Sequence, residues 1–277
     1  MKSFSLTLVC LLISLLSIAQ KYKGDSWAKV KAAGSGNLSV VYYEQAGLIQ
    51  DANGTPTGLC VDVLEDFVKF VDTKYKTKLT IKYLGKEPVF SEFLAAAQKN
   101  DNVMGVTNVT ITDERKKIFK FTPPFISNPV VLITHKDAPT VTSFKDLPTK
   151  LNGFVSQIIS GSTHEKHINK IKKENWPNLT ITYGPSGQEI IKKIPTNPKL
   201  FTILDFTEFV DATRKRLPVK KQDLDFGSPE ELAFIMSKQS DWDAVWKEFL
   251  TDEYRRSAKY RKNIADNLGS AFLSILK

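Results

Sequence analysis

Residues 107–125 read Thr-Asn-Val-Thr-Ile-Thr-Asp-Glu-Arg-Lys-Lys-Ile-Phe-Lys-Phe-Thr-Pro-Pro-Phe, which is the most informative stretch of the chain. The apolar residues from 103 to 109 predict a buried strand that ends inside it. Thr112 is a helix N-cap residue, and two acidic residues follow it in the first turn, where negative charge suits the helix dipole. Arg115 therefore sits one turn into a helix, beside the end of a buried strand.

Strand-like and helix-like segments alternate on both sides of this stretch. A helix is predicted where apolar residues recur every three or four positions, and a strand where they alternate. The first series has elements at 39–43, 60–71, 79–83, 90–98 and 103–109, and the second at 130–134, 154–159, 163–173, 179–183, 187–194 and 200–204. A strand at 231–237 and helices at 242–250 and 254–276 follow. This order predicts an α/β protein with two lobes, each a sheet flanked by helices.

The position of Arg115 suggests a binding role. Ligands dock at the carboxyl ends of the strands in an open α/β sheet. A guanidinium group at that edge offers a planar fork that can hold both oxygens of a carboxylate. On physical grounds alone, an ordinary surface arginine is an equally good interpretation.

The N-terminus has the pattern of an export signal. Lys2 is the only charge before the apolar run from Leu6 to Ile18, and small residues follow at the positions that a signal peptidase recognises. We expect residues 1–19 to be a signal peptide cleaved near Ala19, although a retained membrane anchor is the alternative. Cys60 is then the only cysteine of the mature chain, so no internal disulfide can form.

The charge distribution argues against a nucleic-acid groove. The net charge is +9, but the 39 Lys and Arg residues are spread among 30 acidic ones. No block of basic residues is interleaved with aromatic residues, as a nucleic-acid groove would need. We expect a monomer with no nucleic-acid partner and no cofactor.

Two histidines lie three positions apart on one predicted helix face, at His164 and His167. This spacing could bind a metal ion, but no third ligand is evident, so we expect no metal site. Two acids at Glu230 and Glu231 are interpreted as turn chemistry. Trp242 and Trp246, four positions apart, are expected to pack in the core rather than to form a platform for a sugar.

Four stretches together resemble the bacterial solute-binding proteins of family 3, which include glutamine-binding and lysine/arginine/ornithine-binding proteins. The ligand-binding core of ionotropic glutamate receptors is similar. The stretches are Thr110 to Phe125, Gly58-Leu-Cys-Val-Asp-Val63, Ser160-Gly-Ser-Thr163 and Leu204-Asp205. Each motif is weak alone, but the four occur in the family's order across nearly the whole mature chain.

The resemblance implies how the anionic end of a ligand is held. Arg115 would grip the α-carboxylate, and Thr110 would add its hydroxyl and backbone N–H to the carboxylate or amino group. Ser162 and Thr163 would offer N–H groups at the start of a helix, which is a favourable anion site.

It also implies how the cationic end and the pocket wall are formed. Asp205 would pair with the α-ammonium group, and Asn108 stands where the family uses a backbone carbonyl to accept from that group. Leu59 replaces an aromatic that relatives stack over the ligand, and Tyr42 or Tyr43 would compensate. The side chain of the ligand is therefore not determined.

The resemblance further implies a type II periplasmic-binding fold with two hinge crossings, near residues 126–128 and 231–232. Lobe 1 would comprise residues 20–127 and 233–277, and lobe 2 residues 128–232. Because residues of both lobes would bind the ligand, a bound ligand would favour the closed arrangement of the lobes.

The implied function is capture of a small zwitterionic ligand, an amino acid, in the periplasm. The protein would then deliver it to an inner-membrane ABC permease, or act as a sensor. The rival interpretation is a secreted enzyme on the same scaffold, similar to cyclohexadienyl dehydratases, with Glu44 or Glu208 as a candidate acid near the cleft.

Overall fold

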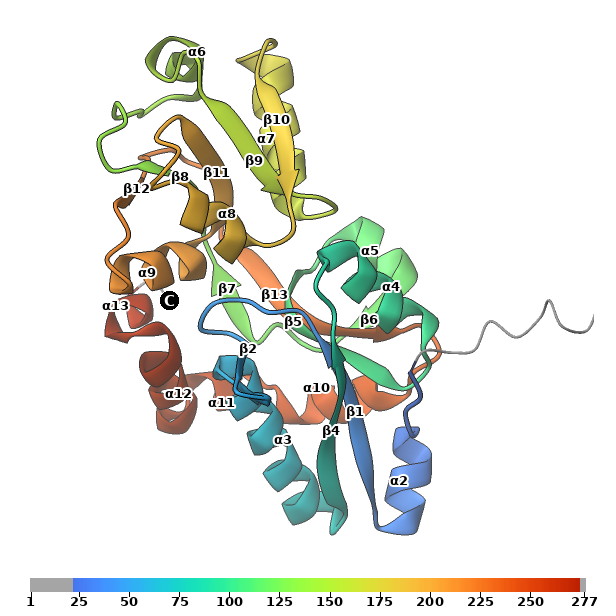
Figure 1. Ribbon diagram of the computed structural model, residues 1–277. Coiled ribbons are helices and arrows are strands. Elements are labelled where there is room, and N and C mark those ends of the chain that lie inside the picture. The colour runs from blue at the N-terminus through green and yellow to red at the C-terminus, as the bar shows by residue number, and fades with distance from the viewer. Residues whose placement is uncertain (1–21, 275–277) are drawn as a thin grey trace, which may run out of the picture.

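The computed structural model describes residues 22–274 and consists of two sheets, one above the other, each flanked by helices (Figure 1). This arrangement confirms the predicted two-lobed α/β fold class. The predicted signal peptide, residues 1–19, and its cleavage near Ala19 lie outside the described residues.

The sheet of the first lobe is mixed. Strand β1 pairs in parallel with β4 and β5, whereas β13 runs antiparallel to β5 and also pairs with β6 and β7. The strands are β1 (Ser35–Tyr42), β4 (Lys78–Lys86), β5 (Val103–Thr110), β6 (Phe119–Phe121), β7 (Ile126–Asn128) and β13 (Glu230–Ser237). A separate hairpin is formed by β2 (Gln50–Ala52) and β3 (Thr55–Thr57).

The sheet of the second lobe has the order β10-β9-β11-β8-β12. Strand β9 pairs in parallel with β10 and β11, and β8 is antiparallel to β11 and β12. The strands are β8 (Val130–His135), β9 (Val155–Ile159), β10 (Thr180–Gly184), β11 (Leu200–Asp205) and β12 (Val219–Lys221).

Helices cover both sheets. Those of the first lobe are α2 (Trp27–Ala33), α3 (Leu59–Tyr75), α4 (Phe90–Lys99), α5 (Asp113–Ile118), α10 (Trp242–Phe249), α11 (Asp252–Arg256), α12 (Ala258–Leu268) and α13 (Ser270–Leu273). Those of the second lobe are the 3-10 helix η1 (Phe144–Asp146), α6 (Leu147–Lys150), α7 (Thr163–Glu174), α8 (Gly187–Lys193) and α9 (Phe206–Arg214).

The chain crosses between the lobes twice, and the two crossings lie side by side. It leaves the first sheet after β7 and returns at the start of β13, where Glu230 pairs with Asn128. Two adjacent extended segments of this kind can bend together, which is the geometry of a hinge.

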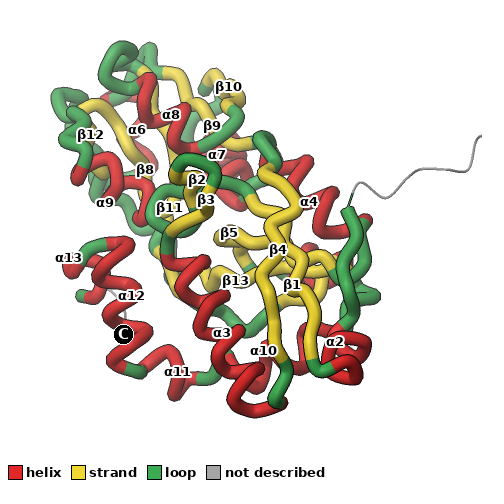
Figure 2. The backbone as a smooth tube through the Cα atoms, turned by 60° about the horizontal axis from the view of Figure 1, so that its bottom comes forward, coloured by secondary structure: helices red, strands yellow, loops and turns green. Residues whose placement is uncertain are grey.

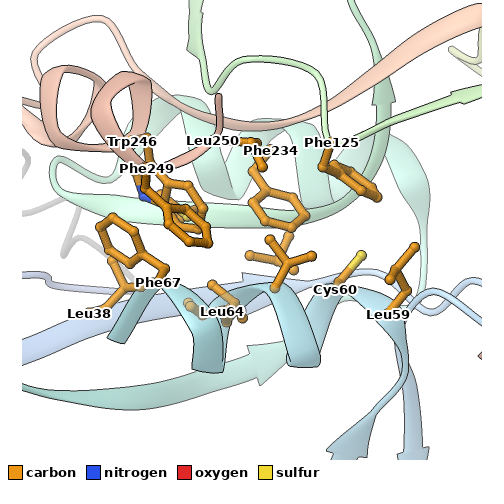
Figure 3. Packing of buried hydrophobic residues seen from close by; sticks show 14 of the residues in the cluster. Leu38, Leu59, Cys60, Leu64, Phe67, Phe125, Phe234, Trp246, Phe249 and Leu250 are labelled. Carbon is orange, nitrogen blue, oxygen red and sulfur yellow. The ribbon is translucent and has the colours of Figure 1, made fainter. Parts of the chain in front are cut away.

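The core of the first lobe is built around α3 and α10 (Figure 3). The Phe67 ring stacks on Trp246 with a centroid separation of 3.9 Å and an interplanar angle of 10°. Trp242 and Trp246 are 1% and 0% exposed, so the prediction that both pack in the core is confirmed. Leu59 and Cys60 belong to the same buried cluster.

The predicted single helix at 254–276 is wrong over its described part, because it consists of three helices. Ser257 has an extended conformation and its side chain caps the next helix by accepting from Tyr260 N. Gly269 has a φ of 90°, which a residue with a Cβ rarely adopts, so α12 ends there. These local breaks turn α12 and α13 toward α9 (Figure 2).

Among residues 22–274, no helix combines the length and the apolar character needed to cross a membrane.

We expect Trp246→Ala to lower the free energy of unfolding by about 3–5 kcal/mol, because it leaves a cavity beneath Phe67. Urea unfolding followed by far-UV circular dichroism measures this. The control is Ile118→Ala, at a side chain that is 43% exposed, which should change the free energy by less than about 0.5 kcal/mol. Equal effects of the two changes would contradict the packing described.

Candidate functional site

Strand ends from both lobes meet in one pocket between them. Thr110 ends β5 and Asp205 ends β11, and both line the pocket. The Asn108 side-chain amide donates to the Asp205 carboxylate across the lobes. The lining residues are Tyr43, Gln45, Phe90, Asn108, Thr110, Arg115, Ile159, Ser162, Thr163, His164, Asp205 and Glu208. All the predicted binding residues except Leu59 are therefore brought together.

Leu59 lies elsewhere. It is fully buried in the first-lobe core, at the start of α3, and does not line the pocket (Figure 3). Gly58 has a φ of 121°, and a Cβ at this position would lie 2.5 Å from Leu48 O. The N–H groups of Leu59 and Cys60 donate to Gly47 O and Leu48 O. The loop around Leu48 is thus packed against the start of α3, and Leu59 is buried beneath it rather than exposed to the cleft.

Arg115 is positioned as the local sequence predicts. Its backbone N–H donates to the Thr112 side chain, which caps α5, at 3.2 Å. The guanidinium donates to Thr110 O at 3.1 Å within the first lobe and to Gly161 O at 3.0 Å in the second. Burial lowers the pKa of Arg115, while Glu230, Asp205 and Glu114 act to raise it, so the group stays cationic between the lobes.

The loop before α7 meets Arg115 from the opposite side. Gly161 has a φ of 75°, which favours glycine and turns its carbonyl oxygen toward the guanidinium. The Ser162 hydroxyl donates to Ile159 O at 2.7 Å instead of capping the helix. The Ser162 side chain therefore leaves the first N–H groups of α7 uncapped, and these N–H groups could bind an anion.

Glu230, interpreted from the sequence as turn chemistry, instead lies beside the pocket at the start of β13. Its Oε2 accepts from the Thr110 hydroxyl at 2.6 Å and from the Thr163 hydroxyl at 2.9 Å. Its Oε1 lies 3.3 Å from His167 Nε2. Burial acts to raise the pKa of Glu230, but these hydrogen bonds and the charge of His164 lower it to about 2. The sequence offers no local signal for this residue, because Glu230 reaches the pocket only through the antiparallel pairing of β13.

A buried titratable cluster lies on the second-lobe side. His164, Asp205 and Glu208 are 5%, 3% and 2% exposed. His164 Nε2 is 3.4 Å from Asp205 Oδ1. Burial lowers the pKa of His164, but Asp205, Glu230 and Glu208 raise it by a larger amount.

Glu208 is the acid of the sequence-based enzyme hypothesis, and it does line the pocket. Burial, and to a smaller extent the charge of Asp205, raise the pKa of Glu208 to about 8, against a lowering contribution from His164. The carboxyl group is therefore mostly protonated at neutral pH. The other candidate, Glu44, accepts from Asp51 N at 2.8 Å and is not among the pocket residues.

From the sequence, Tyr42 and Tyr43 were alternatives for the aromatic wall of the pocket, and Tyr43 is the one that lines it. Its hydroxyl donates to Pro185 O of the second lobe at 2.9 Å, and its ring contacts Phe90 edge-on with 5.4 Å between centroids. The cavity that remains between these side chains is small, about 30 Å³. The lobes are therefore closed on one another.

We expect the stability of the protein to fall relative to that of Glu208→Gln as the pH rises from about 5 to about 8. The folded state keeps a proton on Glu208 that the unfolded carboxyl group has already released. The free energy of unfolding therefore falls by up to about 1.4 kcal/mol for each pH unit in that window. Urea unfolding of both proteins at a series of pH values, in buffer that contains a metal chelator, measures the difference in their free energies of unfolding. Glu174→Gln, at an exposed position of α7, is the control and should leave the pH dependence unchanged.

Residues 41–226 match the family model described as bacterial extracellular solute-binding proteins, family 3. The probable amino-acid-binding protein YxeM of Bacillus subtilis (strain 168) is 24% identical over 273 residues, which cover 95% of this chain and 93% of YxeM.

Solved structures agree in fold. A putative L-cystine ABC transporter protein from Listeria monocytogenes has a TM-score of 0.68 and 21% identity, covering 85% of this chain and 97% of its own. The ancestral amino acid-binding protein AncCDT-1, a precursor of cyclohexadienyl dehydratase, has a TM-score of 0.67 and 19% identity, covering 87% and 98%. With more than half of its length matched by the family model, the chain belongs to the bacterial extracellular solute-binding proteins of family 3.

Proposed function

We propose that the protein captures an amino acid in the pocket between its lobes. The observation that carries this proposal is the arrangement of opposite charges in one pocket, with the Arg115 guanidinium contributed by the first lobe and the Asp205 carboxylate by the second. A zwitterion offers the complementary pair of charges, and buried charges are tolerated only when they are paired.

The anionic end of the ligand would bind at Arg115. Its guanidinium has five N–H groups in a planar fork, and the Thr110 and Gly161 carbonyl oxygens accept from two of its nitrogens. The first N–H groups of α7, at Ser162 and Thr163, would complete an anion site. The Thr110 hydroxyl is close enough to contribute after turning away from Glu230.

The cationic end would bind at Asp205. In the closed arrangement Asn108 donates to this carboxylate, so an α-ammonium group would take the place of the Asn108 amide. Tyr43 and Phe90 would form the wall over the ligand, in the role that the sequence analysis gave in part to Leu59.

Binding would require the lobes to part and close again. The space left between the side chains is small, about 30 Å³, and the hydrogen bond from Tyr43 to Pro185 O joins the lobes beside it, so we expect an amino acid to enter after the lobes separate. The two crossings at β7 and β13 would act as the hinge, with residues 20–127 and 233–277 moving against residues 128–232. A ligand held by both lobes favours the closed form.

Delivery to an ABC permease is part of the proposal. It is supported by family membership and by the transport role stated for the Listeria monocytogenes protein. The apolar run from Leu6 to Ile18 supports export to the periplasm with cleavage near Ala19, and we propose that the mature protein acts as a monomer.

A second candidate function, an elimination enzyme, is favoured by one observation. Glu208 lines the pocket with a pKa of about 8, so it could donate a proton to a departing hydroxyl group at neutral pH. The likeness in fold to AncCDT-1 gives this candidate weak support.

We expect Arg115→Ala to weaken binding of the preferred amino acid by at least roughly 30-fold, because it leaves the buried carboxylate of the ligand unpaired. Isothermal titration calorimetry measures the affinity, after a thermal-shift screen of the amino acids has identified the ligand. Protein for both measurements is first unfolded and refolded to remove bound ligand.

Arg115→Lys and Arg261→Ala are the matched controls. The lysine keeps the charge but loses the fork, so its affinity should lie between those of the original protein and Arg115→Ala. Arg261 is exposed on α12 and its loss should leave the affinity unchanged. The absence of a thermal shift with every amino acid would count against the proposal, since a ligand at a hundredfold excess over its Kd stabilises by about 2.7 kcal/mol.

We expect the protein to return its ligand unchanged and to form no aromatic product from cyclohexadienyl carboxylic acids. Loss of water from such a ring can be followed by ultraviolet absorbance. Product formation that Glu208→Gln abolishes would instead establish the enzyme.

A further inference from the structure

We propose that a divalent transition metal ion, with Zn²⁺ preferred, binds at His164, Asp205 and Glu230, where the second lobe meets the hinge crossing. One donor atom from each of these residues lies within 4.8 Å of the other two. In the sequence, His164 and His167 have the spacing of a metal-binding pair, but no third ligand is evident. Folding supplies two carboxylates, one from the end of β11 and one from the start of β13.

The spacing of the donors suits a small tetrahedral ion. Two ligands bound to zinc at about 2.0–2.1 Å lie about 3.3 Å apart in a tetrahedral site. His164 Nε2 and Asp205 Oδ1 are 3.4 Å apart. Glu230 must move by a small amount toward this pair, since the three donors span up to 4.8 Å. One imidazole with two carboxylates is a donor set that zinc accepts, with a fourth position left for water or a ligand.

Unpartnered buried atoms point into this position. Within residues 22–274, neither ring nitrogen of His164 has a hydrogen-bond partner, and Asp205 Oδ1 has none. The 3.4 Å contact between His164 and Asp205 therefore lacks hydrogen-bond alignment, although both side chains are at least nine-tenths buried. Buried polar atoms without partners are costly, and a metal ion would satisfy Nε2 and Oδ1 together.

The surroundings supply an outer shell for the ion. His167 Nε2 lies 3.3 Å from Glu230 Oε1, and the Thr110 and Thr163 hydroxyls donate to Oε2. Hydrogen bonds of this kind orient a carboxylate that binds a metal. The dication would neutralise the carboxylates of Asp205 and Glu230. Arg115, the permanent cation of the pocket, does not do so, because its guanidinium donates to carbonyl oxygens rather than to these carboxylates.

A metal at this position would join the second lobe to the crossing between the lobes. His164 and Asp205 belong to the second lobe, and Glu230 lies at the crossing, where β13 begins and pairs with Asn128. A bound ion would therefore fix the second lobe against the end of the hinge segment. The proposal goes beyond the proposed function. Since it shares Asp205 with the expected ammonium site, metal and amino acid are to be tested separately.

The test is zinc uptake by untagged protein. The purified protein is stripped with EDTA, dialysed to equilibrium against buffered zinc sulfate and measured by elemental mass spectrometry. We expect one zinc ion per chain and a higher melting temperature with zinc than with EDTA. His164→Gln and, independently, Glu230→Gln should weaken the affinity by more than about 100-fold, since even loss of an outer-shell partner costs 10- to 100-fold. His167→Gln removes an outer-shell partner and should weaken the affinity for zinc by about 10- to 100-fold.

His135→Gln is the matched control, because His135 lies on β8 and pairs with Asp137 away from the pocket. It should bind zinc as the original protein does. No uptake above that of His164→Gln, with both proteins folded by circular dichroism, would overturn the proposal, as would equal losses in His164→Gln and His135→Gln.

Calorimetry with amino acids in EDTA separates the two proposals. Arg115→Ala should lose amino-acid binding while it still takes up zinc. Amino-acid binding without zinc uptake would overturn the metal site alone, and zinc uptake without binding of any amino acid would overturn the proposed function alone.

Discussion

Strand β13 pairs antiparallel with β5 and β7, and both the hinge and the pocket follow from this pairing. Because β13 runs opposite to β5, its first residue, Glu230, comes to lie beside Thr110 at the end of β5. The same strand pairs Glu230 with Asn128 at the crossing between lobes and carries Phe234 into the core, where it contacts Phe125. Hinge, core and pocket are therefore mechanically connected through one strand.

Polar contacts join the closed lobes, beside a buried hydrophobic cluster that runs from Tyr43 and Phe90 of the first lobe to Ile159 and Ile190 of the second. Asn108 donates to Asp205, and Arg115 donates to Gly161 O, so in each case one partner comes from each lobe. Separation of the lobes would leave these groups to water, and a bound zwitterion could replace them with stronger charged pairs. These buried polar groups therefore contribute to the energetic difference between the empty and the occupied closed form.

The C-terminal helices add a second connection between the lobes, apart from the hinge (Figure 2). Arg214 of α9 donates to Asn267 O at 2.9 Å, and the rings of Phe206 and Phe272 lie 6.0 Å apart between centroids. These contacts join α12 and α13 of the first lobe to α9 of the second. A hinge motion must either break them or carry α12 and α13 along with the second lobe.

Local patterns in the sequence were enough to predict the α/β order, the capping of α5 by Thr112 and the position of Arg115 at a strand end. Periodicity and caps depend on residues within a turn or two of one another. Tertiary structure decided the rest. Glu230 reaches Thr110 across 120 residues of chain, and Leu59 enters the core rather than the pocket because the loop at Leu48 packs against the start of its helix. His164 gains its carboxylate neighbours only when β11 and β13 take their places beside it. The contacts of Glu230 and His164 depend on pairing between strands far apart in the sequence, which no local pattern encodes.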